Sequence, residues 1–276
     1  MNQAIPSPTL SINQIQDQLT TRSFGRTLHL FSSLTSTNTV ALTLAESGAP
    51  HGTVVLADRQ TAGRGRMGRS WHSPPGRNIY CSVLITDFPS PDRLPWIPLA
   101  TGLALVQALE SETKRSLSVK WPNDVLLSQK KVAGILCERS VCSSSSFLVV
   151  GYGVNVNIAP SELPVELQQT ATSLFHETGQ YFDRNVLIAR TLATLERQFD
   201  RLLGDFETIR QEYLQRCSTI GQHVQVQLMP PHSAVEGVAA GLSQDGALQL
   251  ILGPNASTAG KATTFEIRAG EVVHIR

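Results

Sequence analysis

Runs of apolar residues, some alternating with polar ones and some continuous, divide most of the chain into short strands and a few helices. Helical spacing predicts a short helix near 12–19, a helix between a cap at 35–37 and Gly48, a buried helix at 98–109 and a long amphipathic helix at 183–203, with a shorter helix ending near 214. The serine run at 143–146 is predicted to be a turn between two strands. Strands are predicted at 27–31, 53–57, 79–86, 117–120, 125–127, 131–138 and 147–156.

The pattern changes after Gly221, where only short strands are predicted, at 223–229, 235–241, 247–252 and 272–275. Pro230-Pro231, Asp245-Gly246 and Gly253-Pro254 separate them, and Asp-Gly is a strong hairpin signal. A β module of this size buries little core by itself, so we expect it to pack against the first domain. The predicted organisation is an N-terminal extension (1–26), a larger domain (27–219) and a C-terminal β domain (220–276).

Composition narrows the class of protein. The chain has 276 residues and a formal net charge of +1, so a broad nucleic-acid-binding surface is not expected. No apolar run is long enough for a membrane span, and the N-terminus lacks the pattern of a secretory signal. The four cysteines show no C-x-x-C spacing and the histidines form no H-x-x-x-H pair, which argues against a zinc site. We therefore expect reduced thiols and a cytoplasmic protein.

The segment from Gly63 to Trp71, called the arginine loop below, reads Gly-Arg-Gly-Arg-Met-Gly-Arg-Ser-Trp. Glycines allow close backbone approach, and arginines suit carboxylate and phosphate groups. The loop matches G-x-G-x-x-G, with Asp87 at the distance of a dinucleotide fingerprint, but that fingerprint needs a helix directly afterwards. Ser-Pro-Pro-Gly at 73–76 cannot begin a helix, and the next element is a strand. A kinase loop is excluded because no H-R-D or D-F-G follows. The loop is predicted to close over an anion.

Four other segments carry candidate chemistry, and each also has a purely structural interpretation. Lys120-Trp-Pro-Asn-Asp124 combines a cation with two Asx side chains but is also ordinary turn chemistry. Lys131 begins an apolar strand in which Gly134 marks either a close approach by a ligand or a bulge. Gly151-Tyr-Gly-Val-Asn-Val-Asn157 ends a strand with small residues and amides, which tight backbone packing also explains. Ser36-Thr37-Asn38 precedes a predicted helix and is also a simple helix cap.

Together these segments resemble the biotin–protein ligases, or biotin–[acetyl-CoA-carboxylase] ligases, from about Leu30 to the C-terminus. The resemblance rests on five motifs in the family's order: Ser-Thr-Asn (36–38), Gln-Thr-Ala-Gly-Arg-Gly-Arg-Met-Gly-Arg-Ser-Trp (60–71), Lys-Trp-Pro-Asn-Asp (120–124), Lys-Val-Ala-Gly-Ile-Leu-Cys-Glu (131–138) and Gly-Tyr-Gly-Val-Asn (151–155). It implies an α+β fold in which a mixed β-sheet with flanking helices forms a class II synthetase-like catalytic domain. A small SH3-like β-barrel follows it.

The resemblance also implies a reaction and its participants. Biotin attacks the α-phosphorus of Mg-ATP to give biotinyl-5′-AMP, and a lysine of an apo biotin carboxyl carrier protein then takes the biotinyl group. Cations must bring the two anions together, and water must be kept from the mixed anhydride. ATP, Mg²⁺ and biotin are the implied substrates and ion, with no permanently bound cofactor or zinc. No DNA or membrane partner is implied, and relatives occur as monomers or homodimers.

By similarity, each motif is expected to have a role in binding or catalysis. Lys131 and Arg66 are expected to be catalytic, and Lys120 and Asp124 to support the site electrostatically. The segment at 171–174 resembles the loop that covers adenine in relatives. Residues expected to bind biotin are Ser36, Thr37, Asn38, Gln60, Gly63, Arg64, Arg66, Trp71, Lys131 and Gly134. Those expected to bind the nucleotide are Arg64, Arg66, Arg69, Asn123, Lys131 and Asn155.

Two departures from the family pattern bear on function. Met67 stands where some relatives carry another arginine, which alters only the charge of the loop. The residues before Ser36 are too few for the winged helix-turn-helix of repressor-type relatives, and they carry no basic recognition helix, so no transcriptional role is expected. Lipoate–protein ligases and octanoyltransferases share the fold but are not expected to show the arginine loop. RNA binding through this Arg-Gly segment would need repeats and aromatic platforms, which the chain lacks.

Overall fold

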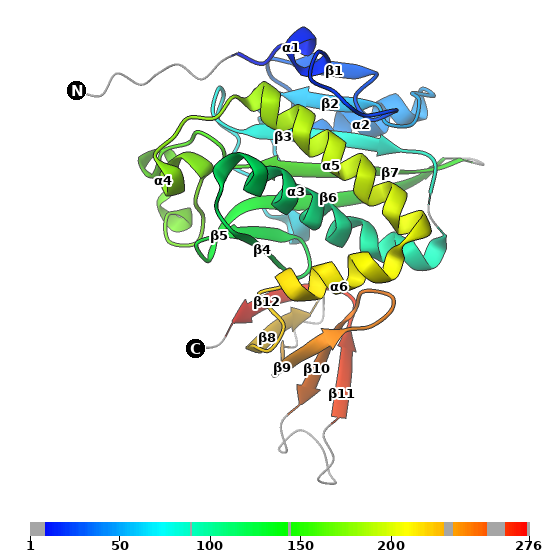
Figure 1. Cartoon of the computed structure of the whole chain (residues 1–276), viewed down its shortest axis with the longest axis vertical. Coiled ribbons are helices and arrows are strands. Elements are labelled where there is room, and N and C mark those ends of the chain that lie inside the picture. Colours follow the sequence, from blue (N-terminus) through cyan, green and yellow to red (C-terminus); the bar gives the residue numbers. More distant parts are fainter. Residues whose placement is uncertain (1–8, 89, 143–144, 229–233, 253–262, 275–276) are drawn as a thin grey trace.

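The computed structural model describes residues 9–88, 90–142, 145–228, 234–252 and 263–274. A seven-stranded mixed sheet in the order β1-β2-β3-β7-β6-β5-β4 forms the centre of the molecule (Figure 1). β1 and β2 are parallel, and every other neighbouring pair is antiparallel. The strands are β1 (Leu28–Phe31), β2 (Val54–Ala57), β3 (Ile79–Ile85), β4 (Leu117–Lys120), β5 (Asp124–Leu127), β6 (Lys130–Cys142) and β7 (Ser145–Val154).

Helices cover the two faces of this sheet unequally. The long helices α3 and α5 lie across one face, while α2 packs against β2, β3 and β7 on the other (Figure 1). The helices are α1 (Ile12–Gln16), α2 (Thr37–Glu46), α3 (Ile97–Thr113), α4 (Leu174–Thr178), α5 (Arg184–Gly204) and α6 (Phe206–Arg216). Short 3-10 turns are η1 (Arg66–Gly68), η2 (Pro91–Trp96), η3 (Pro160–Glu162) and η4 (Val165–Leu167).

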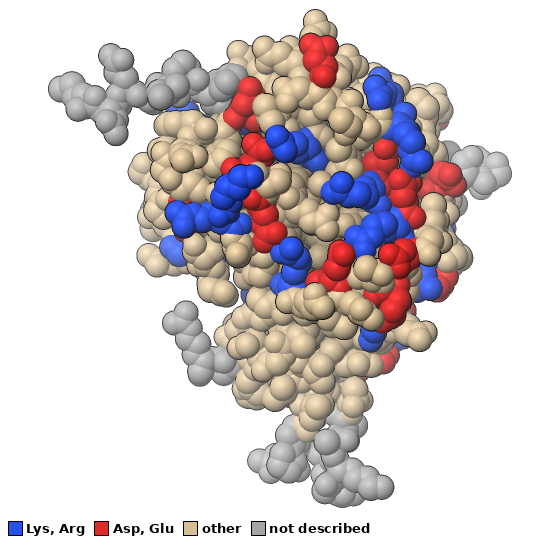
Figure 2. Space-filling view, viewed as in Figure 1, with Lys and Arg blue, Asp and Glu red and all other residues tan. Residues whose placement is uncertain are grey.

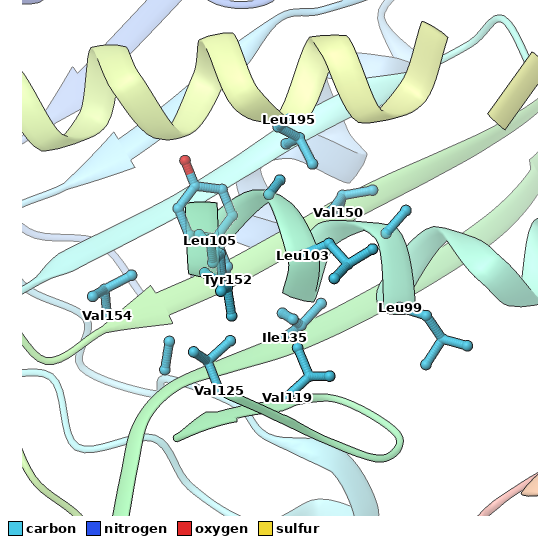
Figure 3. Close-up of a cluster of buried hydrophobic side chains, with 14 of the residues drawn as sticks. Leu99, Leu103, Leu105, Val119, Val125, Ile135, Val150, Tyr152, Val154 and Leu195 are labelled. Carbon is cyan, nitrogen blue, oxygen red and sulfur yellow. The ribbon is translucent and has the colours of Figure 1, made fainter. Parts of the chain in front are cut away.

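The main hydrophobic core lies between the sheet and the helices α3 and α5. Leu103 of α3 and Leu195 of α5 point toward Ile135 of β6 and Tyr152 of β7 (Figure 3). Successive side chains of a strand point to opposite faces, so the residues on either side of Ile135 and Tyr152 point away from this core. Those neighbours include Gly134, Gly151 and Gly153, which leaves part of the α2 face of the sheet without side chains.

The C-terminal residues form a separate five-stranded antiparallel sheet, in the order β11-β10-β9-β8-β12. It packs against the first domain, as predicted: Trp96 Nε1 donates to Gln244 O at 2.8 Å and Trp121 Nε1 donates to Gly246 O at 3.1 Å. The predicted Asp-Gly hairpin is confirmed, with Gly246 at φ +78° between β9 and β10. The strands are β8 (His223–Leu228), β9 (Ala234–Leu242), β10 (Leu248–Leu252), β11 (Thr263–Ile267) and β12 (Gly270–His274).

Three details of the sequence prediction were wrong. Ser145 and Ser146 belong to β7, paired with Cys142 and Val141, because the hairpin continues further than the apolar run indicates; positions 143 and 144 lie outside the described residues. β11 was missed. α1 ends at Gln16, well before the predicted end at 19. Cys81, Cys137 and Cys217 are free thiols, as expected, and nothing is described of the Cys142 side chain.

The segment before β1 packs closely against α5. Ile15 and Phe24 are buried in the main core. The Glu196 carboxylate accepts hydrogen bonds from the backbone N–H groups of Arg22, Ser23 and Phe24 at 2.7–2.9 Å. Residues 11–26 therefore contribute to the same core as the sheet.

Candidate functional site

A cavity of about 850 Å³ lies where α2, the arginine loop and β6–β7 meet, and β12 of the C-terminal sheet lines part of it. It brings together residues from all five motifs. Among the predicted site residues, Gly63 at the start of the loop does not line the cavity, and a Cβ there would meet Trp71 O and Ser73 Oγ at 2.7 Å. The predicted residues that line the cavity are Ser36, Thr37, Asn38, Gln60, Arg64, Arg66, Arg69, Trp71, Lys120, Asn123, Asp124, Lys131, Gly134 and Asn155.

The floor of the cavity is bare backbone of the sheet. Gly134 of β6 pairs with Gly153 of β7. A Cβ on Gly153 would lie 2.5 Å from the Trp71 ring, and one on Gly134 would lie 2.9 Å from it, so the indole rests directly on these glycines. Trp71 Nε1 is buried without a hydrogen-bond partner in the described structure. The site thus combines a floor of sheet backbone with an aromatic ring that lies on it.

Polar residues at the start of α2, after β2 and on β3 form what we call the polar cradle: Ser36, Thr37, Asn38, Gln60 and Ser82. Thr37 N and Oγ1 both contact Gln60 Oε1, at 2.9 and 3.2 Å. Ser82 Oγ contacts Thr37 Oγ1 at 2.8 Å and Asn38 Oδ1 at 2.6 Å. Ser36 occupies the N-cap position of α2, but its side chain makes no capping hydrogen bond. Its buried hydroxyl is therefore not committed to the helix, and the cap interpretation of Ser36 does not account for it.

The arginine loop folds back on itself between Gly63 and Trp71. Gly65 N donates to Arg69 O at 2.7 Å and Trp71 N donates to Gly63 O at 2.9 Å. At its tip Met67 has φ +57° and is exposed to solvent. The loop therefore forms a narrow turn whose three arginines project from a short stretch of chain.

The three loop arginines and Lys131 each have an oxygen partner within the protein. Arg66 Nη1 donates to Asn123 Oδ1 at 3.2 Å, and burial lowers the pKa of Arg66, although Asp124 opposes this effect. Burial also lowers the pKa of Lys120, again opposed by Asp124. The ion pairs are Arg64 with Glu138 at 2.8 Å, Arg69 with Glu271 at 2.5 Å and Lys131 with Asp124 at 2.6 Å.

The segment at 171–174 lies beside Lys131, where the resemblance places a nucleotide. Lys131 N donates to Thr170 O at 2.8 Å, and Thr172 N donates to Lys131 O at 2.9 Å. Asn155 Nδ2 donates to Thr172 O at 2.9 Å. The Asn155 amide therefore holds this segment as well as lining the cavity.

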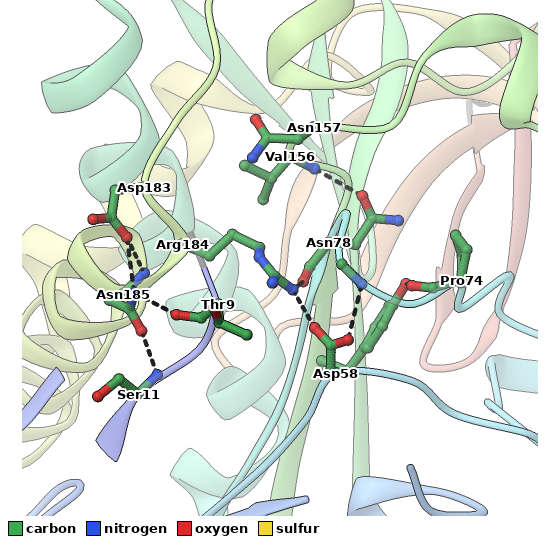
Figure 4. A network of polar contacts seen from close by, with 12 residues as sticks. Thr9, Ser11, Asp58, Pro74, Asn78, Val156, Asn157, Asp183, Arg184 and Asn185 are labelled. Atoms are coloured by element: carbon green, nitrogen blue, oxygen red, sulfur yellow. Dashed lines mark hydrogen bonds and ion pairs between the residues drawn. The ribbon is translucent and has the colours of Figure 1, made fainter. Parts of the chain in front are cut away.

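The two ends of the segment that contains the arginine loop are held by one buried ion pair. Arg184, at the start of α5, donates to Asp58 Oδ1 at 2.8 Å and to Asn78 O at 3.1 Å (Figure 4). The other Asp58 oxygen accepts from Gly76 N at 3.0 Å. Asp58 precedes the loop, and Gly76 and Asn78 follow it, so the side chains fix both points where the loop leaves the sheet.

Sequence reasoning assigned no site role to several of these residues. Glu138 was part of a motif but received no role, and Glu271 and Arg184 resemble ordinary surface charges on a strand and a helix. Asp58 directly follows a buried strand and is close to Gln60, which was a usable signal. For the other three, only the spatial arrangement shows which cation or chain segment each carboxylate or guanidinium meets.

On the face shown in Figure 2, Lys and Arg are interspersed with Asp and Glu over the first domain. Among the described residues, no group of three or more His, Cys, Asp or Glu could hold a metal ion. Within the same residues, no helix is both long and apolar enough to cross a membrane.

Comparison with known proteins identifies the family. A profile of the biotin/lipoate A/B protein ligase family matches residues 30–155. The chain is 35% identical over 276 residues to a biotin–[acetyl-CoA-carboxylase] ligase of Mycobacterium tuberculosis, covering 98% of this chain and 97% of the relative. The chain belongs to the biotin protein ligase family.

The chain is also similar to a bifunctional relative and to a biotin protein ligase of known structure. It is 34% identical to the bifunctional ligase/repressor BirA of Bacillus subtilis, over 87% of this chain and 74% of the relative. The solved biotin protein ligase of Aquifex aeolicus in complex with biotin and ATP superposes with a TM-score of 0.74 at 32% identity, covering 91% of this chain and 99% of that one. These matches confirm that the ligase is a mixed α/β enzyme of this family.

Proposed function

We propose that this ligase activates biotin with ATP as biotinyl-5′-AMP and transfers the biotinyl group to a lysine of a biotin carboxyl carrier protein of acetyl-CoA carboxylase. Residues 27–219 would form the catalytic domain, and residues 220–276 an SH3-like domain. The five-stranded antiparallel sheet is compatible with such a barrel. Family membership supports the reaction class, and the arrangement of the cavity supports the division of roles.

The observation that carries the proposal is the combination of a bare glycine floor with cations at one end of the same cavity. A biotin ring and its chain can lie along the cavity beside Trp71, where the missing side chains of Gly134 and Gly153 leave room for the indole and the ligand, with the polar cradle at the ring end. Lys131 stands at the other end, near Trp71. A carboxylate placed there and the α-phosphate of ATP repel each other, so the cations must offset that repulsion in the transition state.

The proposed step is an in-line displacement in which a biotin carboxylate oxygen bonds to the α-phosphorus and pyrophosphate leaves. Lys131 and Arg66 act as the catalytic cations, Arg69 holds a substrate anion after exchanging its present carboxylate partner, and Arg64 holds one with its remaining N–H groups while it keeps Glu138. The cradle residues Ser36, Thr37, Asn38 and Gln60 hydrogen-bond the ureido group. Trp71 packs against biotin, and Asn123 and Asn155 contact the nucleotide. The arginine loop excludes water from the mixed anhydride until a lysine amine attacks the biotinyl carbonyl, which breaks the acyl–phosphate bond and releases AMP.

Magnesium would enter with the nucleotide, as part of the substrate. Asn123 and Asp124 place side-chain oxygens beside Arg66 and Lys131, and one or two protein oxygens are typical where Mg²⁺ is held mostly by phosphates and water. Asp124 would then release Lys131, from which it is 2.6 Å away. The Asp124 carboxylate would then be free to bind Mg²⁺, and the Lys131 ammonium would be free to bind the substrate anions.

The test is ATP–pyrophosphate exchange by the purified chain with biotin, lipoate or octanoate as the acid, followed by transfer of radiolabelled biotin to an apo carrier domain. Exchange that depends on biotin, together with labelling of one carrier lysine, is the expected result. Exchange with lipoate or octanoate alone would identify a different acid substrate in the wider family. Adenylation without transfer to the carrier would contradict the proposed acceptor.

A further inference from the structure

Glu138 lies at the junction between the polar cradle and the arginine loop. It is on β6, on the same face of the strand as Gly134 and Leu136, because residues two apart share a face. Its side chain is 25% exposed. Gly134 forms the floor of the cavity and Leu136 lines it, so Glu138 continues that surface outward beneath the loop.

One carboxylate oxygen of Glu138 accepts hydrogen bonds from both the polar cradle and the arginine loop. Asn38 Nδ2, in the cradle, donates to Oε2 at 2.7 Å, and Arg64 Nη2, in the loop, donates to the same oxygen at 2.8 Å. Asn38 Nδ2 also donates to Leu136 O at 3.1 Å. These bonds connect the start of α2, strand β6 and the first arginine of the loop through a single side chain.

The carboxylate also determines how the Asn38 amide is oriented. Both Nδ2 hydrogens point to acceptors, Leu136 O and Glu138, so Oδ1 must point the other way, toward Ser82 Oγ at 2.6 Å. The hydrogen-bonded chain continues from Ser82 through Thr37 and Gln60 to Ser73 Oγ, just after the loop. The polar cradle is thus connected to both ends of the arginine loop.

Arg64 needs such a partner to remain in place. Its side chain is 44% exposed, and it also makes one long hydrogen bond, to Thr39 Oγ1 at 3.4 Å. A long exposed side chain without a charged partner samples many rotamers, and its ordering costs entropy each time a ligand binds. The ion pair with Glu138 limits this freedom before the ligand arrives.

We propose that Glu138 is a positioning residue that couples the biotin cradle to closure of the arginine loop, by holding Asn38 and Arg64 on one carboxylate oxygen. The inference rests on the proposed function. Glutamine at 138 still offers an oxygen to Asn38 but loses the charge that holds Arg64, whereas alanine loses both contacts. Comparing the two substitutions therefore distinguishes the effect of the Arg64 contact, in the loop, from that of the Asn38 contact, in the cradle.

The experiment is a double-mutant cycle with Glu138→Gln and Arg64→Gln, in which the dissociation rate of biotinyl-AMP and the KM for biotin are measured. We expect Glu138→Gln to raise the dissociation rate about tenfold with the biotin KM changed less than about twofold. In the Arg64→Gln background, Glu138→Gln should have no further effect. Glu138→Ala should raise the biotin KM as well, by about tenfold.

A matched control is Glu112→Gln. It breaks the Arg190–Glu112 pair, whose 2.6 Å distance and side-chain exposures of 52% and 21% resemble those of Arg64–Glu138, but which lies on α3 and α5, away from the cavity. This variant should keep both wild-type values. If the effects of Glu138→Gln and Arg64→Gln multiply, or if Glu138→Gln retains biotinyl-AMP like the wild type, the coupling is wrong while the proposed function stands. If the wild type forms no biotinyl-AMP, the proposed function fails and the coupling fails with it.

Discussion

Lys131 is the residue on which the proposed adenylation depends most directly. Its Nζ is 2.6 Å from Asp124 and 5.4 Å from the centre of the Trp71 ring. The loop arginines Arg66 and Arg64 have other partners, Asn123 and Glu138 respectively. We predict that Lys131→Ala lowers biotin-dependent ATP–pyrophosphate exchange by at least about 100-fold, because the ammonium between Asp124 and the Trp71 ring is lost. Lys131→Arg should restore only part of the rate, since a planar guanidinium does not replace a compact ammonium. A wild-type rate in Lys131→Ala would refute the assignment.

Gly153 is a residue whose missing side chain matters. An added Cβ would meet Trp71 Cε2 and Nε1 at 2.5 Å, so the indole would have to move off the floor. We predict that Gly153→Ala raises the KM for biotin about tenfold, equivalent to ~1.4 kcal/mol, in steady-state assays. Gly204→Ala is the control: this position ends α5, and no atom lies within 4 Å of the new methyl group. Equal KM values in the two variants would show that the position of the ring is unimportant.

At the scale of elements, the arginine loop is expected to retain the reactive adenylate. Arg66 connects the loop to the turn after β4, through its hydrogen bond to Asn123. We predict that Arg66→Gly releases biotinyl-AMP roughly tenfold faster. The freed mixed anhydride should then label lysines of an unrelated protein added to the assay, which mass spectrometry detects. Labelling confined to the carrier lysine would contradict a retaining role for Arg66. Mobility of residues 63–70 without ligand also remains a prediction.

The ion pair between Asp58 and Arg184 joins two elements, the end of β2 and the start of α5. Arg184 is only 1% exposed, so removing the Asp58 carboxylate takes a counter-charge from a buried guanidinium. We predict that Asp58→Ala lowers the free energy of unfolding by about 3 kcal/mol, measured by urea denaturation. Asp200→Ala, which breaks an exposed pair with Arg22, should cost less than about 1 kcal/mol. Similar losses of unfolding free energy in both variants would contradict the larger contribution expected from the buried ion pair.

At the scale of the whole molecule, Glu196 connects the segment before β1 to the core, and this contact makes stability depend on pH. Burial alone would raise the pKa of Glu196, but hydrogen bonds from the backbone of Phe24, Arg22 and Ser23 lower it on balance. The folded-state pKa therefore lies below the unfolded-state value. The carboxylate stabilises the fold above the unfolded-state pKa, and this contribution is lost as the pH falls through the folded-state pKa.

We accordingly predict that Glu196→Gln lowers the free energy of unfolding by about 1–3 kcal/mol at neutral pH. The difference from the wild type should shrink in acid, where the wild-type carboxyl is protonated. Denaturant unfolding of both proteins across a pH series measures this. A difference that stays constant down to the acid limit would mean that the ionised form has no special role.

Most of the fold was predictable because local patterns agree with it. The strands before β7 and the two long helices have apolar runs bounded by turn residues or caps, such as Asp183 before α5. β11 was missed because Thr-Thr-Phe-Glu-Ile is short and contains few apolar residues, and its place is fixed by pairing with β10. Strand order was beyond the sequence pattern, since it depends on which distant strands meet.

The candidate site also contains residues that the sequence identifies and residues that it does not. Residues such as Lys131, Gly134 and Arg66 stand in conspicuous motifs, and all three line the cavity. Glu138 and Glu271 are single carboxylates on strands, indistinguishable in sequence from solvent-facing charges. Their roles depend on the loop arginines that fold over them, which is a long-range property. Sequence patterns therefore identify the cations of the site better than the carboxylates that hold them.

The three indoles of the chain lie in environments that an optical measurement can distinguish. Trp96 and Trp121 donate to carbonyl groups of the C-terminal domain, whereas Trp71 Nε1 is buried against glycines without a hydrogen-bond partner in the described structure. Indole emission depends on polarity and hydrogen bonding around the ring. A chain that keeps Trp71 alone would report occupation of the glycine floor in real time, and one that keeps Trp96 and Trp121 would report separation of the two domains. No added dye is needed for either measurement.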